Sequence, residues 1–208
     1  MRTLATAPPE CPSLECVLTE AAAARGFRAL EQIAGQSAAV RAGGGAGFDA
    51  VARSAMALLT LERLVAADRG GAVDLCALLN RLVTLVQLAA PGGSTMSTRL
   101  AGVEVPPLFA RGVVAATLEL VNVVEPLMVW TGRPIVQFVM AVEEGDLVLT
   151  VAAAPGAEVP DAAAARCMDR AVRIARLLGG AAVRGLDGGL HLAGLVCPLP
   201  GGGAGRWS

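Results

Sequence analysis

Few side chains in this sequence are of the types that form covalent intermediates, transfer protons or bind metals. The 208 residues include one histidine, His191, and all 17 basic residues are arginine. The absence of lysine excludes a lysine-dependent phosphate loop or Schiff base. The five cysteines are Cys11, Cys16, Cys76, Cys167 and Cys197. They form no C-x-x-C pair and lack the histidines of a usual zinc set, so we expect free thiols in a reducing compartment.

Composition narrows the class of protein further. Hydrophobic residues make up 54% of the chain and the net charge is −1, which argues against nucleic acid as a partner. The most apolar stretch, residues 113–130, contains Glu119, Asn122 and Glu125, which a membrane span tolerates badly. The N-terminus has no basic start followed by an apolar run. We therefore expect a cytoplasmic protein with a sizeable core.

The first half of the chain has the pattern of a helical hairpin. Apolar residues recur at helical spacing over residues 13–41, at Leu14, Val17, Leu18 and Ala21, and next at Ala24 or Arg25. Glycines at positions 43–47 end this helix, and a second one is predicted over residues 49–67. Since a hairpin with one apolar stripe per helix rarely stands alone, we expect a homodimer that completes a four-helix bundle.

The second half alternates between helices and strands. The pattern predicts helices over residues 74–89, 106–128 and 161–178, with Asp74 capping the first. Strands are predicted over 98–105, 133–142, 147–153, 181–185 and 190–196, with a tight turn at 143–146. We therefore predict an α+β fold, in which a helical hairpin precedes a two-layer sandwich of helices on one face of a mixed or antiparallel sheet. Arg166, Arg170 and Arg173 are expected on the solvated face of the last helix.

This order of elements resembles a bacterial histidine phosphotransferase or the core of a histidine kinase. Residues 54–79 resemble the second helix and domain junction of HWE-type kinases, where a stretch like ALALVHELL precedes VDLxxYL. The resemblance covers roughly residues 14–197. It implies a dimerisation domain over residues 13–69 and a sandwich of the histidine-kinase ATPase type over residues 70–200.

The phosphoacceptor motif of that family is incomplete in this sequence. It reads H-R-x-x-N in the first helix, and its best match is residues 24–28. Arg25 matches the motif, but Ala24 stands where the histidine belongs and Arg28 where the asparagine belongs. Because a methyl group cannot accept a phosphoryl group, the resemblance implies no transfer at this position.

The nucleotide-binding motifs are also incomplete. The metal-binding box E-L-x-x-N matches Glu119, but Val123 occupies the asparagine position. Asn122 is one residue early, which turns it about 100° away on a helix. The adenine-binding D-x-G-x-G aligns with residues 152–156, where Ala153 replaces the aspartate. The glycine-rich lid is missing as well, so we expect no nucleotide cofactor and no metal.

Some positions of the phosphoacceptor face remain candidates for partner binding: Ala24, Arg25, Arg28, Glu20 and Glu31. The two glutamates can share the face of Ala24, where they are either docking residues or simply solvated. The two arginines either meet the acidic pocket of a receiver domain or form an exposed pair.

The leading hypothesis is a non-enzymatic signalling module that binds a response-regulator receiver domain or a histidine kinase without phosphotransfer. One alternative is an active phosphotransferase that uses His191, although this residue lies in a predicted strand rather than in a helical bundle. Another is a dimeric scaffold outside phosphorelay. The sequence names neither the partner nor the direction of regulation.

Overall fold

The computed structural model describes residues 13–26, 60, 71–89, 95–128, 135–153, 162–187 and 190–201. Both Arg28 and Glu31 lie outside these ranges, as do the predicted second helix over residues 49–67, apart from position 60, and the glycine break before it. The dimer contact expected from the complete hairpin therefore stays a prediction.

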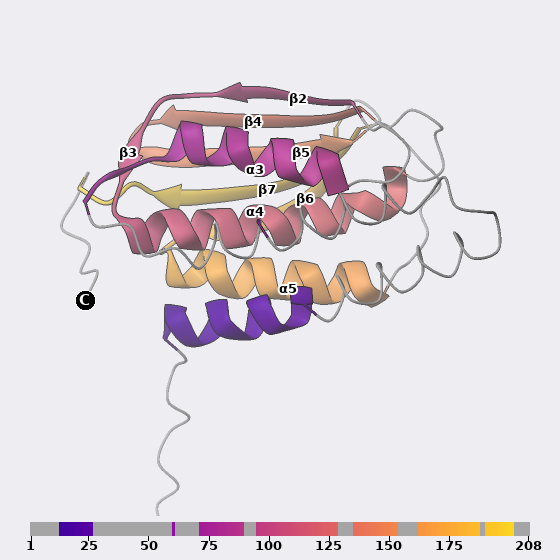
Figure 1. The fold of residues 1–208 in the computed structure, drawn as a ribbon, viewed down its shortest axis with the longest axis horizontal. Coiled ribbons are helices and arrows are strands. Elements are labelled where there is room, and N and C mark those ends of the chain that lie inside the picture. Colours follow the sequence, from indigo (N-terminus) through magenta and orange to yellow (C-terminus); the bar gives the residue numbers. More distant parts are fainter. Residues whose placement is uncertain are drawn as a thin grey trace, which may run out of the picture.

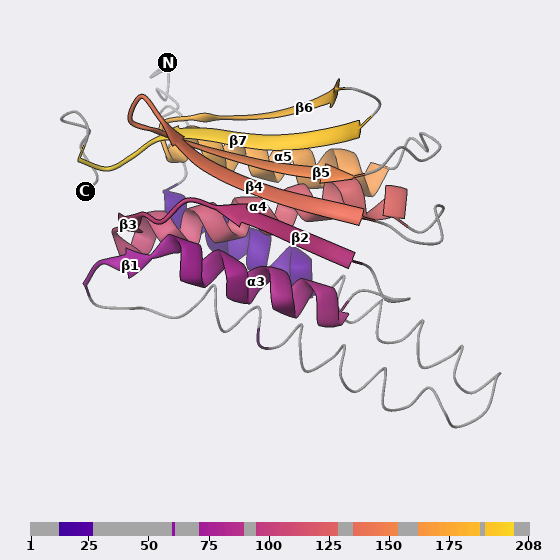
Figure 2. The same cartoon turned by 90° about the horizontal axis from the view of Figure 1, so that it is seen from above.

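A mixed sheet of five strands forms one layer of the fold (Figures 1 and 2), with the strand order β2-β4-β5-β7-β6. The strands are β2 (Thr95–Leu100), β4 (Ile135–Glu143), β5 (Asp146–Ala153), β6 (Ala181–Asp187) and β7 (Leu190–Pro198). Strand β2 pairs with β4 in parallel, and the other neighbours are antiparallel. The mixed sheet is confirmed: the hairpins β4–β5 and β6–β7 give two of the antiparallel pairs, and β7 returns beside β5 to give the third. The connection from β2 to β4 contains helix α4, as a parallel pair requires a crossover.

The single strand predicted over residues 98–105 is wrong. The chain forms β2 up to Leu100 and then a separate short strand, β3 (Glu104–Val105), which pairs with β1 (Val73–Asp74). Between them, the Ala101 amide donates to the Met140 carbonyl at 2.9 Å. The alternating sequence pattern over residues 98–105 runs through both strands, so it does not reveal that the hydrogen-bonding partner changes.

The turn predicted at residues 143–146 is confirmed as the two-residue connection between β4 and β5. Glu144 and Gly145 both have positive φ, at 52° and 92°. Two consecutive left-handed residues are typical of the hairpin turn whose twist matches that of its strands. Glycine at the second position adopts this conformation without the steric cost of a Cβ atom.

Three helices cover one face of the sheet: α3 (Leu75–Ala89), α4 (Pro107–Met128) and α5 (Ala162–Leu177) (Figure 1). The predicted cap of α3 is confirmed, since Asp74 Oδ1 accepts a hydrogen bond from the Ala77 amide at 3.0 Å. Residues 107–124 of α4 are long and apolar enough to cross a membrane, but 78% of that window is buried inside the fold. We therefore describe α4 as the central core helix.

Close contact between α4 and α5 depends on a glycine. A Cβ atom at Gly112 would lie 2.7 Å from Cδ2 of Leu178, so the small residue lets the end of α5 approach α4. The inward face of α5 is as predicted, with Cys167, Ala171 and Ile174 fully buried. The two helices thus pack directly against each other over the sheet.

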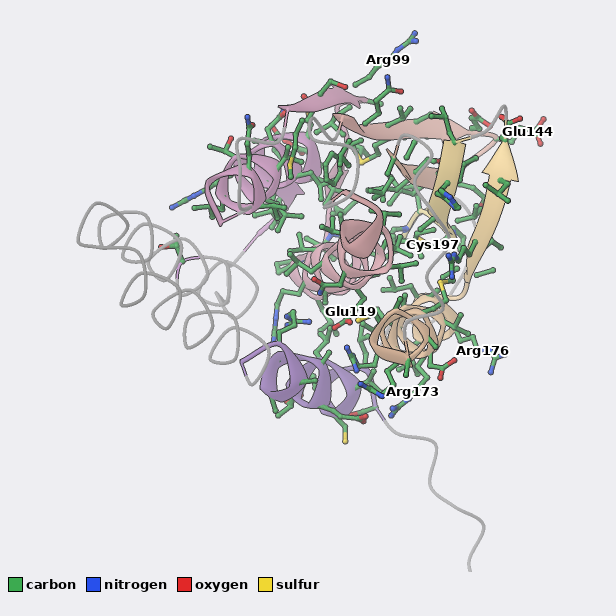
Figure 3. The ribbon with its side chains drawn as sticks, turned by 90° about the vertical axis from the view of Figure 1, so that its right-hand side faces the viewer. Arg99, Glu119, Glu144, Arg173, Arg176 and Cys197 are labelled. Atoms are coloured by element: carbon green, nitrogen blue, oxygen red, sulfur yellow. The ribbon has the colours of Figure 1, made fainter. Side chains whose placement is uncertain are left out.

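The helix formed by residues 14–26 adds a third layer on the outer side of α4 and α5 (Figures 1 and 3). Its predicted apolar stripe is confirmed: Val17, Leu18 and Ala21 are buried in the same core cluster as α4 and α5. Its outward face consists of exposed residues, namely Glu15, Cys16, Thr19, Glu20 and Ala23. The described part of the first helix therefore has its apolar face covered within the same chain.

Candidate functional site

The candidate site is the seam where residues 14–26 meet α4 and α5. At the start of the helix, Ser13 Oγ accepts a hydrogen bond from the Cys16 amide at 3.2 Å, as expected of an N-cap residue. The buried face then continues from Ala21 to Arg25, one turn later. Of the two alternatives for this stripe, Ala24 or Arg25, the structure buries Arg25 and leaves Ala24 half-buried.

A carboxylate of α4 lies between two arginines in this seam. Glu119 is 0% exposed, and its Oε1 lies 3.3 Å from Nη1 of Arg25. Its Oε2 lies 2.8 Å from Nη2 of Arg170 on α5. Figure 3 shows Glu119 between α4, α5 and the first helix. Each carboxylate oxygen therefore has one cationic partner, as a buried charge requires.

Arg170 remains charged in this environment. Burial lowers the pKa of Arg170, but the hydrogen bond and the negative charge of Glu119 outweigh that effect and hold the pKa above its ordinary value. Nη2 of Arg170 also lies 3.2 Å from Sγ of Cys167, one turn earlier. The expectation that Arg170 lies on a solvated face was wrong, because α5 is covered there by the first helix.

A second ion pair joins the same helices closer to solvent. Nη1 and Nη2 of Arg173 donate to Oε1 and Oε2 of Glu20, both at 2.8 Å. The side chains are 41% and 54% exposed. The hydrogen bond from Arg173 holds the pKa of Glu20 below its ordinary value. Glu20 was expected to be either a docking residue or a solvated one, and it contacts this chain's own α5.

The residues that replace the expected nucleotide-binding side chains are buried in the hydrophobic core. Val123, at the expected asparagine position, is buried in α4, whereas Asn122 is only half-buried. Ala153, at the expected aspartate position, is buried at the end of β5. Among the described residues, no group of three His, Cys, Asp or Glu side chains could hold a metal ion.

His191 lies in the sheet rather than in the seam. It is 4% exposed in β7, paired in register with Ala153 of β5 and Leu186 of β6. The sequence reading placed His191 in a strand correctly. The pairing of Glu119 with Arg25 and Arg170 was not predicted, and the available signal was a glutamate between apolar neighbours in a mostly apolar helix.

The chain is similar to histidine kinase cores across most of its length. The histidine kinase domain of a blue-light-activated histidine kinase from Erythrobacter litoralis gives a TM-score of 0.53 at 18% identity, covering 89% of this chain and 95% of that one. A bacterial phosphotransferase gives 0.58 at 13% identity, covering 92% and 99%. A histidine kinase from Burkholderia phymatum gives 0.51 at 15% identity, covering 86% and 98%.

No protein-family model and no curated protein matches the sequence. The structural similarity establishes the fold: N-terminal helices followed by a mixed five-stranded sheet packed with helices. The predicted fold class and the resemblance to histidine kinase and phosphotransferase cores are therefore confirmed.

Proposed function

We propose that this chain is a cytoplasmic, non-catalytic signalling module with a histidine phosphotransferase-like fold. It binds a two-component partner, either a receiver domain or a histidine kinase, and does not transfer phosphate to it. The histidine kinase-like fold supports a partner from a two-component system. The residues of the seam support the absence of phosphotransfer. Homodimerisation through residues 13–69 is part of this proposal.

The contact between Arg25 and Glu119 carries the proposal. Arg25 directly follows Ala24, the residue at the phosphoacceptor position, and Glu119 is the glutamate that matches the metal-binding box. The 3.3 Å ion pair between them, together with Arg170, occupies both oxygens of the carboxylate. A Mg²⁺ ion would have to displace a guanidinium from a buried site, at a cost in unpaired charge. The cluster of Arg25, Glu119 and Arg170 therefore disfavours both phosphoryl transfer next to Ala24 and Mg²⁺ binding at Glu119.

The burial of His191 disfavours the enzymatic alternative. A phosphoacceptor imidazole must reach the aspartyl phosphate of a partner, whereas His191 is 4% exposed between two neighbouring strands. The side chain is accommodated as part of the sheet, which is a common structural role for a lone histidine.

Phosphate labelling of the full chain tests the catalytic half of the proposal. The purified protein is incubated separately with Mg-ATP and with phosphoramidate, a small donor to accessible imidazoles, and its intact mass is measured. We expect no added phosphoryl group in the wild type or in His191→Ala. A phosphorylated wild type that becomes unlabelled in His191→Ala would establish the enzymatic alternative instead.

Affinity capture followed by titration tests the binding half. The full chain is used to capture proteins from its source cell, and any receiver domain or histidine kinase recovered is purified and titrated by calorimetry. We expect Arg28→Glu to weaken binding and to leave the oligomeric state unchanged, with a larger effect at low salt. Equal affinities of the wild type and Arg28→Glu would mean that the partner binds elsewhere than at Arg28. If neither a receiver domain nor a histidine kinase is recovered, the scaffold alternative is favoured.

A further inference from the structure

We propose that residues 14–26 form a releasable latch, which Arg25 closes on Glu119. Docking engages part of this helix's own face, the one on which the partner of the proposed function would bind. The identity of that partner rests on the proposed function, but the latch itself rests only on the contacts of the described residues.

The first helix is attached by a small apolar contact. Only Val17, Leu18 and Ala21 bury their side chains fully, whereas residues 112–121 of α4 are buried without interruption. Leu14 is partly buried against the same core, and the ion pairs of Arg25 and Glu20 add polar attachments. Because few apolar side chains of residues 14–26 hold this layer, we expect it to open at a lower free-energy cost than the described helices α4 and α5.

The geometry of the buried cluster allows the helix to leave without stranding a charge. Glu119 and Arg170 belong to α4 and α5, which stay together, and their contact is the shorter one at 2.8 Å. Arg25 approaches from the other layer at 3.3 Å. When the first helix undocks, Glu119 keeps Arg170 as its cationic partner. Opening therefore does not leave Glu119 as an unpaired buried charge, which is the strongly destabilising result of removing the partner of a buried ion.

When the first helix is docked, the two described charged residues of the predicted partner face, Glu20 and Arg25, are paired within this chain. Arg25 is 7% exposed, and Glu20, which lies one turn before Ala24, is held by Arg173. Ala24 is itself half-buried. Release would free Arg25 for the acidic pocket of a receiver domain, whose carboxylates are chemically equivalent to Glu119. Partner binding and docking of the first helix are therefore mutually exclusive.

Hydrogen exchange of the full chain, read by mass spectrometry, tests the latch. Arg25→Gln removes the closing charge and leaves Glu119 paired with Arg170, and Glu15→Gln is the control on the exposed face of the same helix. A second variant, Arg25→Met with Glu119→Leu and Arg170→Met, replaces the cluster by apolar side chains of similar size, which commonly preserves packing.

We expect amides of residues 14–26 to exchange at least tenfold faster in Arg25→Gln, with α4, α5 and β5 unchanged. Glu15→Gln should match the wild type, and the apolar variant should exchange more slowly. Unchanged exchange in Arg25→Gln would overturn the latch. Faster exchange throughout the chain would also overturn it, because the helix would then be part of one cooperative unit.

Titration with the receiver domain recovered by affinity capture tests whether docking of the first helix blocks partner binding. Arg25→Gln and the apolar variant both lack the guanidinium of Arg25, but only the apolar variant keeps the first helix docked, so Arg25→Gln should bind the receiver domain more tightly. Equal affinities for these two variants would overturn the mutual exclusion of docking and partner binding. If no receiver domain is recovered, the proposed function fails, whereas the exchange result still decides whether the latch exists.

Discussion

The carboxylate of Glu20 and the guanidinium of Arg173 face each other through two parallel hydrogen bonds of 2.8 Å, although 153 positions separate them in the sequence. The pair joins the first helix to α5 at the solvent edge of the seam, and Figure 3 shows Arg173 directed toward the first helix. It therefore adds a solvent-exposed link between the first helix and α5 beside the buried cluster of Glu119.

Exchanging the charges of this pair should be tolerated better than reversing one of them. Arg173→Glu places two carboxylates together, so we expect faster hydrogen exchange in residues 14–26, and Glu20→Arg combined with Arg173→Glu should restore the wild-type rate. Exposed pairs contribute about 0.2–1 kcal/mol and are screened by salt, so the differences should shrink at 1 M NaCl. Arg176→Glu, exposed on the same helix, is the control; an equal effect there would assign the change to net charge alone.

Acid should weaken the docking of the first helix through Glu20. Because Arg173 holds the pKa of Glu20 below its ordinary value of 4.5, the ion pair contributes fully above pH 4.5 and is lost as the pH falls through the lowered pKa. The ratio of exchange rates in residues 14–26 between Glu20→Gln and wild type should therefore exceed one at pH 6 and fall toward one as the pH drops through the lowered pKa of Glu20. A ratio independent of pH would show that this carboxylate does not contribute.

Gly180→Ala should destabilise the whole sandwich. A Cβ atom at position 180 would meet the Val196 carbonyl oxygen and lie 2.6 Å from Cα of Cys197, so the backbone of β7 would have to move. We expect a loss of about 1–3 kcal/mol in the free energy of unfolding, measured by urea denaturation. Gly185→Ala in β6, where nothing lies within 4 Å, is the matched control and should differ little from wild type.

The cysteines should differ sharply in reactivity. Burial, reinforced by the charge of Asp146, raises the pKa of Cys197 to about 12, so about one thiol in ten thousand is ionised at pH 8. Cys16 is exposed on the first helix. Iodoacetamide at pH 8 should modify Cys16 and spare Cys197 and the buried Cys167, as read by peptide mass spectrometry. In urea all three should react; native labelling of Cys197 would contradict its buried position.

Mg-ATP should not bind measurably. Val123 replaces the metal-binding asparagine, and Ala153 replaces the aspartate that would bind adenine. Loss of a hydrogen bond to a charged group alone costs about 1.5–3 kcal/mol, and loss of the Mg²⁺ ligand adds to this. Isothermal calorimetry on the full chain checks the expectation. Low-micromolar affinity would mean that the alignment of these positions is wrong.

The order of the helices and strands was readable from the sequence because each element carries a local signal. Hydrophobic periodicity located α3, α4 and α5 within a residue or two, and Asp74 marked the start of the first of them. The apolar stripe of the first helix was also correct, from Val17 to Ala21. Where two short strands share one alternating pattern, as in β2 and β3, the pattern alone could not separate them.

By itself the sequence determined the fold class and the absence of a histidine at position 24, because both follow from residue type and local spacing. Only the tertiary structure decided which surface covers the first helix. Arg170 and Arg173 were expected on a solvated face, and Glu20 and Arg25 as docking residues or exposed ones. An amphipathic helix has the same sequence pattern whether its polar edge faces water or another helix. Pairing across 94 and 153 positions depends on how the layers are stacked, and no local pattern encodes that arrangement.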